Sequence, residues 1–107
     1  MPDYTVTNDW SSAAGTSLVG YLPDPTTFDE LVSLFGEPLG QGDKTLAEWV
    51  VRFPNGVVAT IYDWKNYGQK REDITFWHVG GHGKGEVELV TGVLEAHRAS
   101  YGQVLIF

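Results

Sequence analysis

The chain has 107 residues, a formal net charge of -7 and no cysteine. This length fits one domain, and the missing cysteines exclude disulfides, thiolate catalysis and cysteine metal sites. The acidic balance argues against nonspecific nucleic-acid binding, which needs lysine and arginine to neutralise phosphates. The longest apolar run is shorter than the roughly 20 residues that span a bilayer, and the chain starts with no signal-peptide pattern, so we expect a protein of the cytoplasm with no membrane partner.

The first 16 residues contain SSAAGTS and few periodic apolar positions, so we expect them to form a loosely ordered N-terminal arm. The segment LVGYL then begins a short strand, which Pro23 and Pro25 end. Thr27 and Glu30 have the spacing of a capping box, and apolar residues recur at helical spacing after them. We therefore predict a first helix that stops at Gly36.

The segment TLAEWVVRFPNGVVATIYDW predicts a β-hairpin. Pro54 has no N–H to donate to a strand ladder, so a three-residue loop with Gly56 in the left-handed conformation is favoured over a two-residue turn. Phe53 then faces Val57, and alternation assigns one face of the hairpin to the core. The expected core residues are Ala47, Trp49, Val51, Phe53, Val57, Ala59 and Ile61. The opposite face is mixed and carries Glu48, Val50, Arg52, Val58, Thr60, Tyr62 and Trp64.

Two further elements follow the hairpin. We expect a third strand of the meander over Ile74–Val79 and a second helix from about Glu86 to His97. The final QVLIF is either an edge strand or a disordered end. The prediction is an α+β fold, with a mostly antiparallel sheet of about four strands and two helices on one face, in the order β-α-β-β-β-α. Residues 17–107 form its single domain.

Several sequence blocks occur in a distinctive order, namely GTSLVGY, FGEP, GDKT, EW, F, NG, VATIYDWK and WHVGG. Over roughly residues 15–97 this succession resembles a family of small uncharacterised bacteriophage proteins that share these blocks. The chain departs from the family pattern by a longer N-terminal arm and by its extension past His97. The resemblance implies a phage accessory protein in the cytoplasm of a bacterial host, and it transfers no site residue.

Aromatic side chains at the end of the hairpin are the first candidate site. Tyr62, Trp64 and Tyr67 lie on or beyond the mixed face, where large amphipathic rings suit a protein interface. Their partner is expected to be a host protein, with a second copy of the chain as the alternative, so the chain is either a monomer or a homodimer.

The glycine-rich WHVGGHGKG segment is the second candidate site. Its backbone N–H groups, just before a helix, could hold the phosphate of a small ligand, with an aromatic ring stacked on a base. The residues of this possible anion or ligand site are Trp77, His78, Gly80, Gly81, His82 and Lys84. The segment is not a Walker motif, Glu86 and Glu88 would repel a phosphate there, and the other interpretation is a turn that needs positive φ angles.

No catalytic or metal site is predicted. His78 and His82 are four residues apart, but a double glycine separates them and they supply too few ligands for a metal. His78 is otherwise expected on a strand face with Ile74 and Phe76, hydrogen-bonded to a backbone carbonyl or to Asp63. That acid–histidine pair has no evident nucleophile.

The sequence therefore favours a non-enzymatic phage accessory protein without a cofactor, which binds a host macromolecule, and inhibition of an antiviral defence is one role expected of it. The alternatives are a module that sequesters a phosphorylated nucleotide or signal molecule, and a minor virion or assembly component.

Overall fold

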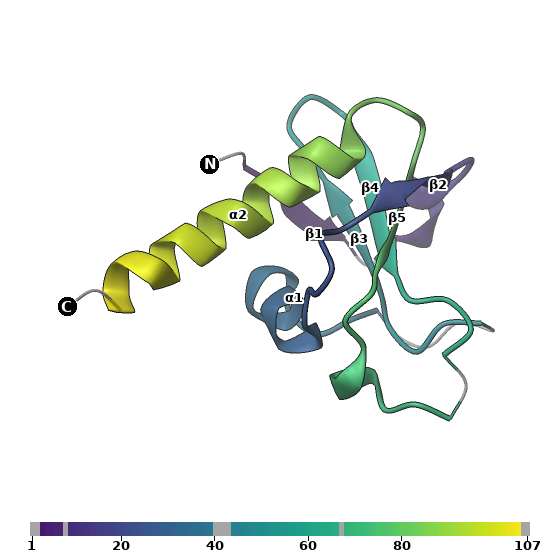
Figure 1. Ribbon diagram of the computed structural model, residues 1–107. Helices are drawn as coiled ribbons and strands as arrows, with labels where there is room; N and C mark the ends of the chain where they lie inside the picture. Colours follow the sequence, from purple (N-terminus) through teal and green to yellow (C-terminus); the bar gives the residue numbers. More distant parts are fainter. Residues whose placement is uncertain (1–2, 8, 40–43, 67, 106–107) are drawn as a thin grey trace.

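The computed structural model describes residues 3–7, 9–39, 44–66 and 68–105, with the backbone alone for residues 101–105. Its antiparallel sheet has five strands in the order β1-β3-β4-β5-β2 (Figure 1). The strands are β1 (Thr5–Thr7), β2 (Ser17–Tyr21), β3 (Glu48–Arg52), β4 (Val58–Tyr62) and β5 (His78–Gly81). The helices are α1 (Phe28–Phe35) and α2 (Glu86–Leu105), with the short 3-10 helices η1 (Trp10–Ala13) and η2 (Arg71–Asp73). The predicted α+β class is confirmed, with five strands rather than about four.

The β3–β4 hairpin has the predicted register. The N–H of Phe53 donates to the carbonyl of Val57 over 2.9 Å, and Gly56 takes a φ of +84° in the three-residue loop. Trp49 pairs with Ile61, and Val51 with Ala59. Pro54 therefore determines the register, because it has no N–H for the ladder hydrogen bond that a two-residue loop would require of it.

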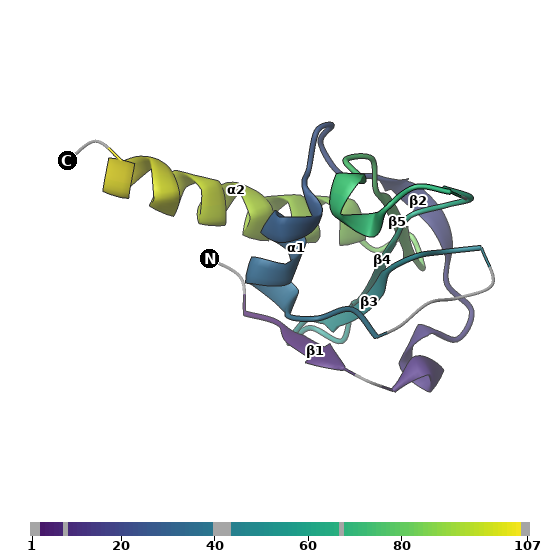
Figure 2. The same ribbon diagram turned by 90° about the horizontal axis from the view of Figure 1, so that it is seen from below.

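The core lies between the sheet and the two α-helices, which cover the same face (Figure 2). We call this the inner face. Every hairpin residue predicted to be in the core is buried, with at most 8% of its surface exposed. The helices contribute the rest of this layer, which includes Phe28, Leu31, Phe35, Val90 and Val93.

The predicted start and end of α1 are confirmed. Thr27 accepts a hydrogen bond from the N–H of Glu30, and the Glu30 carboxylate accepts one from the N–H of Thr27, which completes a capping box. Gly36 ends the helix at a φ of +80°. The capped helix can then present its apolar stripe to the sheet.

The expectation of a loose N-terminal arm is wrong for the described part of residues 1–16. β1 pairs with β3 through Thr5–Arg52, Val6–Val51 and Thr7–Val50. The hydroxyl of Tyr4 donates to the carbonyl of Leu34 over 2.6 Å, which ties the chain to α1. A strand of three residues is too short to show a period of two, so it has no recognisable pattern in the sequence.

The third strand of the meander begins later than predicted. Ile74 closes η2 through a bond to the carbonyl of Arg71, and the carbonyls of Thr75 and Trp77 accept from Thr26 and Leu22 instead of from a strand ladder. β5 therefore covers His78–Gly81 rather than Ile74–Val79.

Helix α2 is longer than the predicted Glu86–His97. It continues to Leu105, so Gln103, Val104 and Leu105 of the QVLIF segment are helical, and residues 106 and 107 lie outside the described residues. Its C-terminal half extends beyond the sheet (Figure 1). Arg98, near the middle of α2, forms an ion pair with Glu30, with Nε and Oε2 2.6 Å apart, which joins α2 to α1.

Candidate functional site

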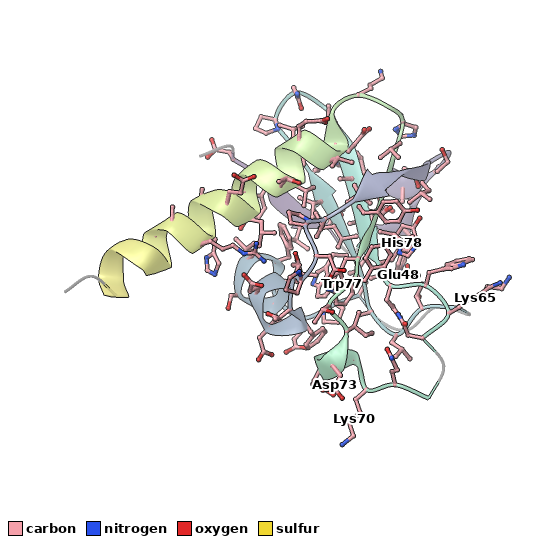
Figure 3. All side chains as sticks on the ribbon, viewed as in Figure 1. Glu48, Lys65, Lys70, Asp73, Trp77 and His78 are labelled. Atoms are coloured by element: carbon pink, nitrogen blue, oxygen red, sulfur yellow. The ribbon has the colours of Figure 1, made fainter. Side chains whose placement is uncertain are left out.

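The face of the sheet opposite the helices, which we call the outer face, carries a row of side chains across four strands. Glu48 on β3 pairs with Tyr62 on β4, Tyr62 with His78 on β5, and His78 with Tyr21 on β2. Directly paired residues point to the same side of a sheet. The register thus brings an acid, two tyrosines and a histidine together (Figure 3 labels Glu48 and His78).

Aromatic and apolar side chains around this row form what we call the outer patch, made of Leu18, Tyr21, Tyr62, Trp64, Phe76 and His78. The His78 ring stacks on Tyr62 with centroids 5.3 Å apart and meets Tyr21 and Phe76 edge-on at 5.1 and 5.4 Å. Four members, Leu18, Tyr21, Trp64 and Phe76, are 45 to 47% exposed. Contiguous exposed apolar side chains of this size typify binding surfaces.

Two hollows meet at Tyr62 and Trp64. One, of about 400 Å³, is lined by Leu18, Tyr62, Trp64 and His78. The other, of about 240 Å³, runs toward η1 and is more polar, because Glu48 and Thr60 line it together with Trp10. We call the latter the polar hollow. Beyond it η1 covers the outer face, where Ser12 bonds to Arg52 and Val50 is fully buried.

His78 has an unusual environment for a polar side chain. Its Nδ1 is buried without a hydrogen-bond partner among the described residues. Burial lowers the pKa of His78, and the negative charge of Asp63 opposes this only in part. Burial also raises the pKa of its neighbour Tyr62, reinforced by the charge of Glu48. Both rings are therefore neutral at pH 7.

Trp64 stands beside two lysines. The Nζ atoms of Lys44 and Lys65 lie 5.6 and 5.8 Å from the centroid of its ring. The segment before β3, which carries Lys44, and the segment after β4, which carries Lys65, are joined by a hydrogen bond. The N–H of Lys65 donates to the carbonyl of Lys44 over 2.8 Å. Within the described part of the chain, no carboxylate forms an ion pair with either lysine. Two uncompensated positive charges thus share one exposed ring.

Asp63 holds together the chain segments that carry Lys44 and Lys65. Its side chain is fully buried, and it accepts hydrogen bonds from the N–H groups of Leu46 and Ala47 at 2.7 and 3.0 Å and from the amide of Asn66 at 3.2 Å. The expectation that His78 would bond to Asp63 or to a carbonyl is wrong for Nδ1, since Asp63 is engaged by these three donors instead.

The glycine-rich loop before α2 already holds an anion of its own. Glu86 is 1% exposed, and its carboxylate accepts from the N–H of His82 over 2.7 Å and from that of Lys84 over 2.8 Å. Burial opposes the charge of Glu86, but these backbone donors outweigh it and lower its pKa. Glu86 therefore occupies the place that a phosphate would take.

The other residues of the predicted ligand site are dispersed. Trp77 is fully buried in the core, and its Nε1–H donates to the carbonyl of Thr26, so its ring cannot stack on a ligand. Gly80 and Gly81 lie within β5, where a methyl group at Gly80 would be 2.3 Å from Oγ1 of Thr60. The ring of His82 contacts the carbonyl of Ala14 at 3.1 Å, and Lys84 is exposed. These residues do not converge with His78 on one cavity.

The predicted interface residues fare differently. Tyr62 and Trp64 lie on the outer face as expected from the hairpin register. Tyr67 lies outside the described residues. Sequence reasoning assigned His78 to the ligand site and missed Leu18, Tyr21 and Phe76 as interface residues. A bulge between Leu18 and Gly20 on β2 hides the alternation that places Leu18 and Tyr21 on one face. Lys44 was missed as well, because only the folded hairpin brings it to Lys65.

Comparisons of the chain with protein-family models, with curated proteins and with solved structures found no match. None of the helices in the described part of the chain has the length and apolar composition that crossing a membrane requires. Nor do the described residues contain a group of three or more histidines and carboxylates placed to hold a metal ion.

Proposed function

We propose that the protein is a non-enzymatic binding protein whose outer patch docks on a protein of a bacterial host. The observation that carries this proposal is the exposed cluster of large rings on the sheet face opposite the two α-helices. Interface centres are enriched in tyrosine, tryptophan and phenylalanine, and the residues that contribute most binding energy cluster there.

The charge of the chain supports a basic partner. The net charge is -7, so a host protein that presents apolar side chains within a basic rim would be attracted at long range and then held by the patch. The phage origin and the host cytoplasm as the site of action come from the resemblance of the sequence blocks, and inhibition of a host defence is the role we propose on that basis.

Co-purification followed by reconstitution tests the proposal. The tagged protein should retain one host protein from a lysate in stoichiometric amount, and the two purified proteins should bind each other. Truncating one hot-spot ring, as in Trp64→Ala or Tyr62→Ala, should weaken that binding at least about tenfold. Val58→Ala, on the same sheet face but near the hairpin turn, is the matched control and should bind normally. Equal binding by all variants would refute docking through the outer patch.

A further inference from the structure

The loops that flank Trp64 combine a flat ring with positive charge. The indole is 45% exposed, and the Nζ atoms of Lys44 and Lys65 both lie within 5.8 Å of its centroid. Two ammonium groups repel each other, so their convergence on one ring without a carboxylate partner among the described residues favours an anion between them.

The backbone holds this arrangement at a conformational cost. Lys65 has a φ of +56°, and it is the only non-glycine residue with positive φ within the described ranges. This left-handed conformation is unfavourable for a residue that has a side chain, and such residues cluster at functional sites, including those that bind ligands. In this conformation the N–H of Lys65 reaches the carbonyl of Lys44. The strain thus places the two lysines together.

The polar hollow beside Trp64 supplies the remaining groups that a nucleotide needs. Tyr62 and Trp64 form an edge-on pair with centroids 6.4 Å apart, and the 45% exposure of Trp64 leaves part of the indole accessible to a stacked base. The carboxylate of Glu48 accepts a hydrogen bond from the hydroxyl of Thr45, and both line the hollow. Glu48 has further lone pairs to accept from an exocyclic amine or a ribose hydroxyl.

We infer that this site binds a nucleotide, with the base stacked on Trp64, the phosphate between Lys44 and Lys65, and an amino or hydroxyl group at Glu48. A free mononucleotide and a nucleotide of a single strand share this chemistry. The net charge of -7 favours the free mononucleotide, because a strand would bring further phosphates toward an acidic protein. This site, and not the glycine-rich loop that the sequence indicates, is the proposed phosphate site, because the N–H groups of His82 and Lys84 in that loop already donate to Glu86.

This inference shares Trp64 with the proposed protein interface but depends on different neighbours. A ligand needs the two lysines and Glu48, whereas a protein partner needs the apolar end of the patch at Tyr21 and Phe76. Tyr21→Ser and Phe76→Ser should therefore weaken partner binding and leave nucleotide binding unchanged, and removal of the lysines should do the reverse. Either proposal can fail without the other.

Two-dimensional NMR of the indole N–H groups tests the site with adenosine 5′-monophosphate as the probe. The signal of Trp64, assigned with Trp64→Phe, should shift and saturate, whereas that of Trp49, whose N–H is bonded to the carbonyl of Gly36, should not. Lys44→Ala with Lys65→Ala should weaken binding at least about tenfold, since two charge-assisted contacts are lost. Lys70→Ala with Lys84→Ala removes the same charge elsewhere and should change affinity less than about twofold.

Two further probes complete the test. Adenosine should bind at least about tenfold more weakly than its monophosphate, because it has no group for the lysines. An eight-nucleotide oligodeoxyadenylate identifies the source: binding of the monophosphate supports a free nucleotide, and binding of the oligomer alone assigns the same site to a single strand. The inference is overturned if Trp64 responds to neither, if adenosine binds as tightly as its monophosphate, or if the two double variants lose affinity equally.

Discussion

The two faces of the sheet use tryptophan in opposite ways. On the inner face Trp49 and Trp77 are fully buried, with ring centroids 5.5 Å apart, and each Nε1–H donates to a backbone carbonyl over 2.8 Å. On the outer side of the molecule Trp10 and Trp64 are 48 and 45% exposed and flank the polar hollow. A buried ring with a satisfied N–H contributes to stability, whereas a half-exposed ring beside a hollow leaves area for a ligand or partner.

Truncating one ring on each face should show the largest difference between the two uses. We expect Trp49→Ala to lower the free energy of unfolding by about 3–5 kcal/mol, because it leaves a large cavity and an unpaired carbonyl. Trp64→Ala should change it by less than about 0.5 kcal/mol, as is usual for an exposed position. Denaturant unfolding measures both. A large loss of stability in Trp64→Ala would show that this ring is structural and would weaken both binding proposals.

Gly80 tests whether the outer face is open everywhere. A methyl group there would lie 2.3 Å from Oγ1 of Thr60 and 3.4 Å from Cε1 of Tyr62, so Gly80→Ala should destabilise the protein by about 1–3 kcal/mol through overpacking.

Gly92 is the matched control for that substitution. It lies within α2, and a methyl group there would meet nothing within 4 Å, so Gly92→Ala should stabilise the protein by about 0.5–1 kcal/mol. If Gly80→Ala were equally harmless, the outer face would be looser around Thr60 than the close approach indicates.

The ion pair that joins the two helices over the inner face should produce an acid-dependent loss of stability. Hydrogen bonding to Arg98 lowers the pKa of Glu30 from 4.5 to about 2. A depressed carboxyl pKa stabilises the fold above the unfolded value, so this contribution is lost as the pH falls from about 4.5 to 2. Because the pair is partly exposed, we expect about 1 kcal/mol rather than the full linkage value. Unfolding of the wild type and Glu30→Gln across this range should converge at the acid end; parallel curves would contradict the linkage.

His78 should produce a smaller effect at higher pH, on the outer face. Its pKa is lowered by burial from 6.5, so the unfolded chain takes up the proton first and stability falls as the pH drops below 6.5. His78→Phe should remove this part of the pH dependence, which we expect to be below about 1 kcal/mol since the ring is only half-buried. Thermal unfolding at pH 7.5 and 5.5 measures it. A variant that retains the wild-type slope would place the titrating group elsewhere.

Local signals predicted much of this fold. The proline in the hairpin loop decided the register, and that register alone separated the inner-face core residues from Tyr62 and Trp64. The capping box at Thr27 placed the start of α1 for a similarly local reason, because two side chains three residues apart satisfy each other's N–H groups.

Features that depend on distant contacts could not be predicted. β1 is defined only by its pairing with β3, and the lysines at 44 and 65 meet only when the hairpin closes. The loop before α2 shows a different limit. The sequence predicts that Glu86 repels a phosphate, whereas in the structure its carboxylate accepts from the N–H groups that the phosphate would need. A carboxylate close to a set of free backbone N–H groups can accept their hydrogen bonds itself, in addition to repelling an anionic ligand.

The buried carboxylate of Asp63 has a consequence for affinity. By accepting from Leu46, Ala47 and Asn66 it fixes the chain on both sides of Trp64 before anything binds. Association generally orders loops and side chains at the interface, and each immobilised side chain costs about 0.5–1.5 kcal/mol. Here the backbone beside Trp64 has already lost its conformational freedom during folding. A ligand that binds the indole therefore has little left to order except the side chains of the two lysines. Preorganisation of this kind lengthens residence times without adding a single contact.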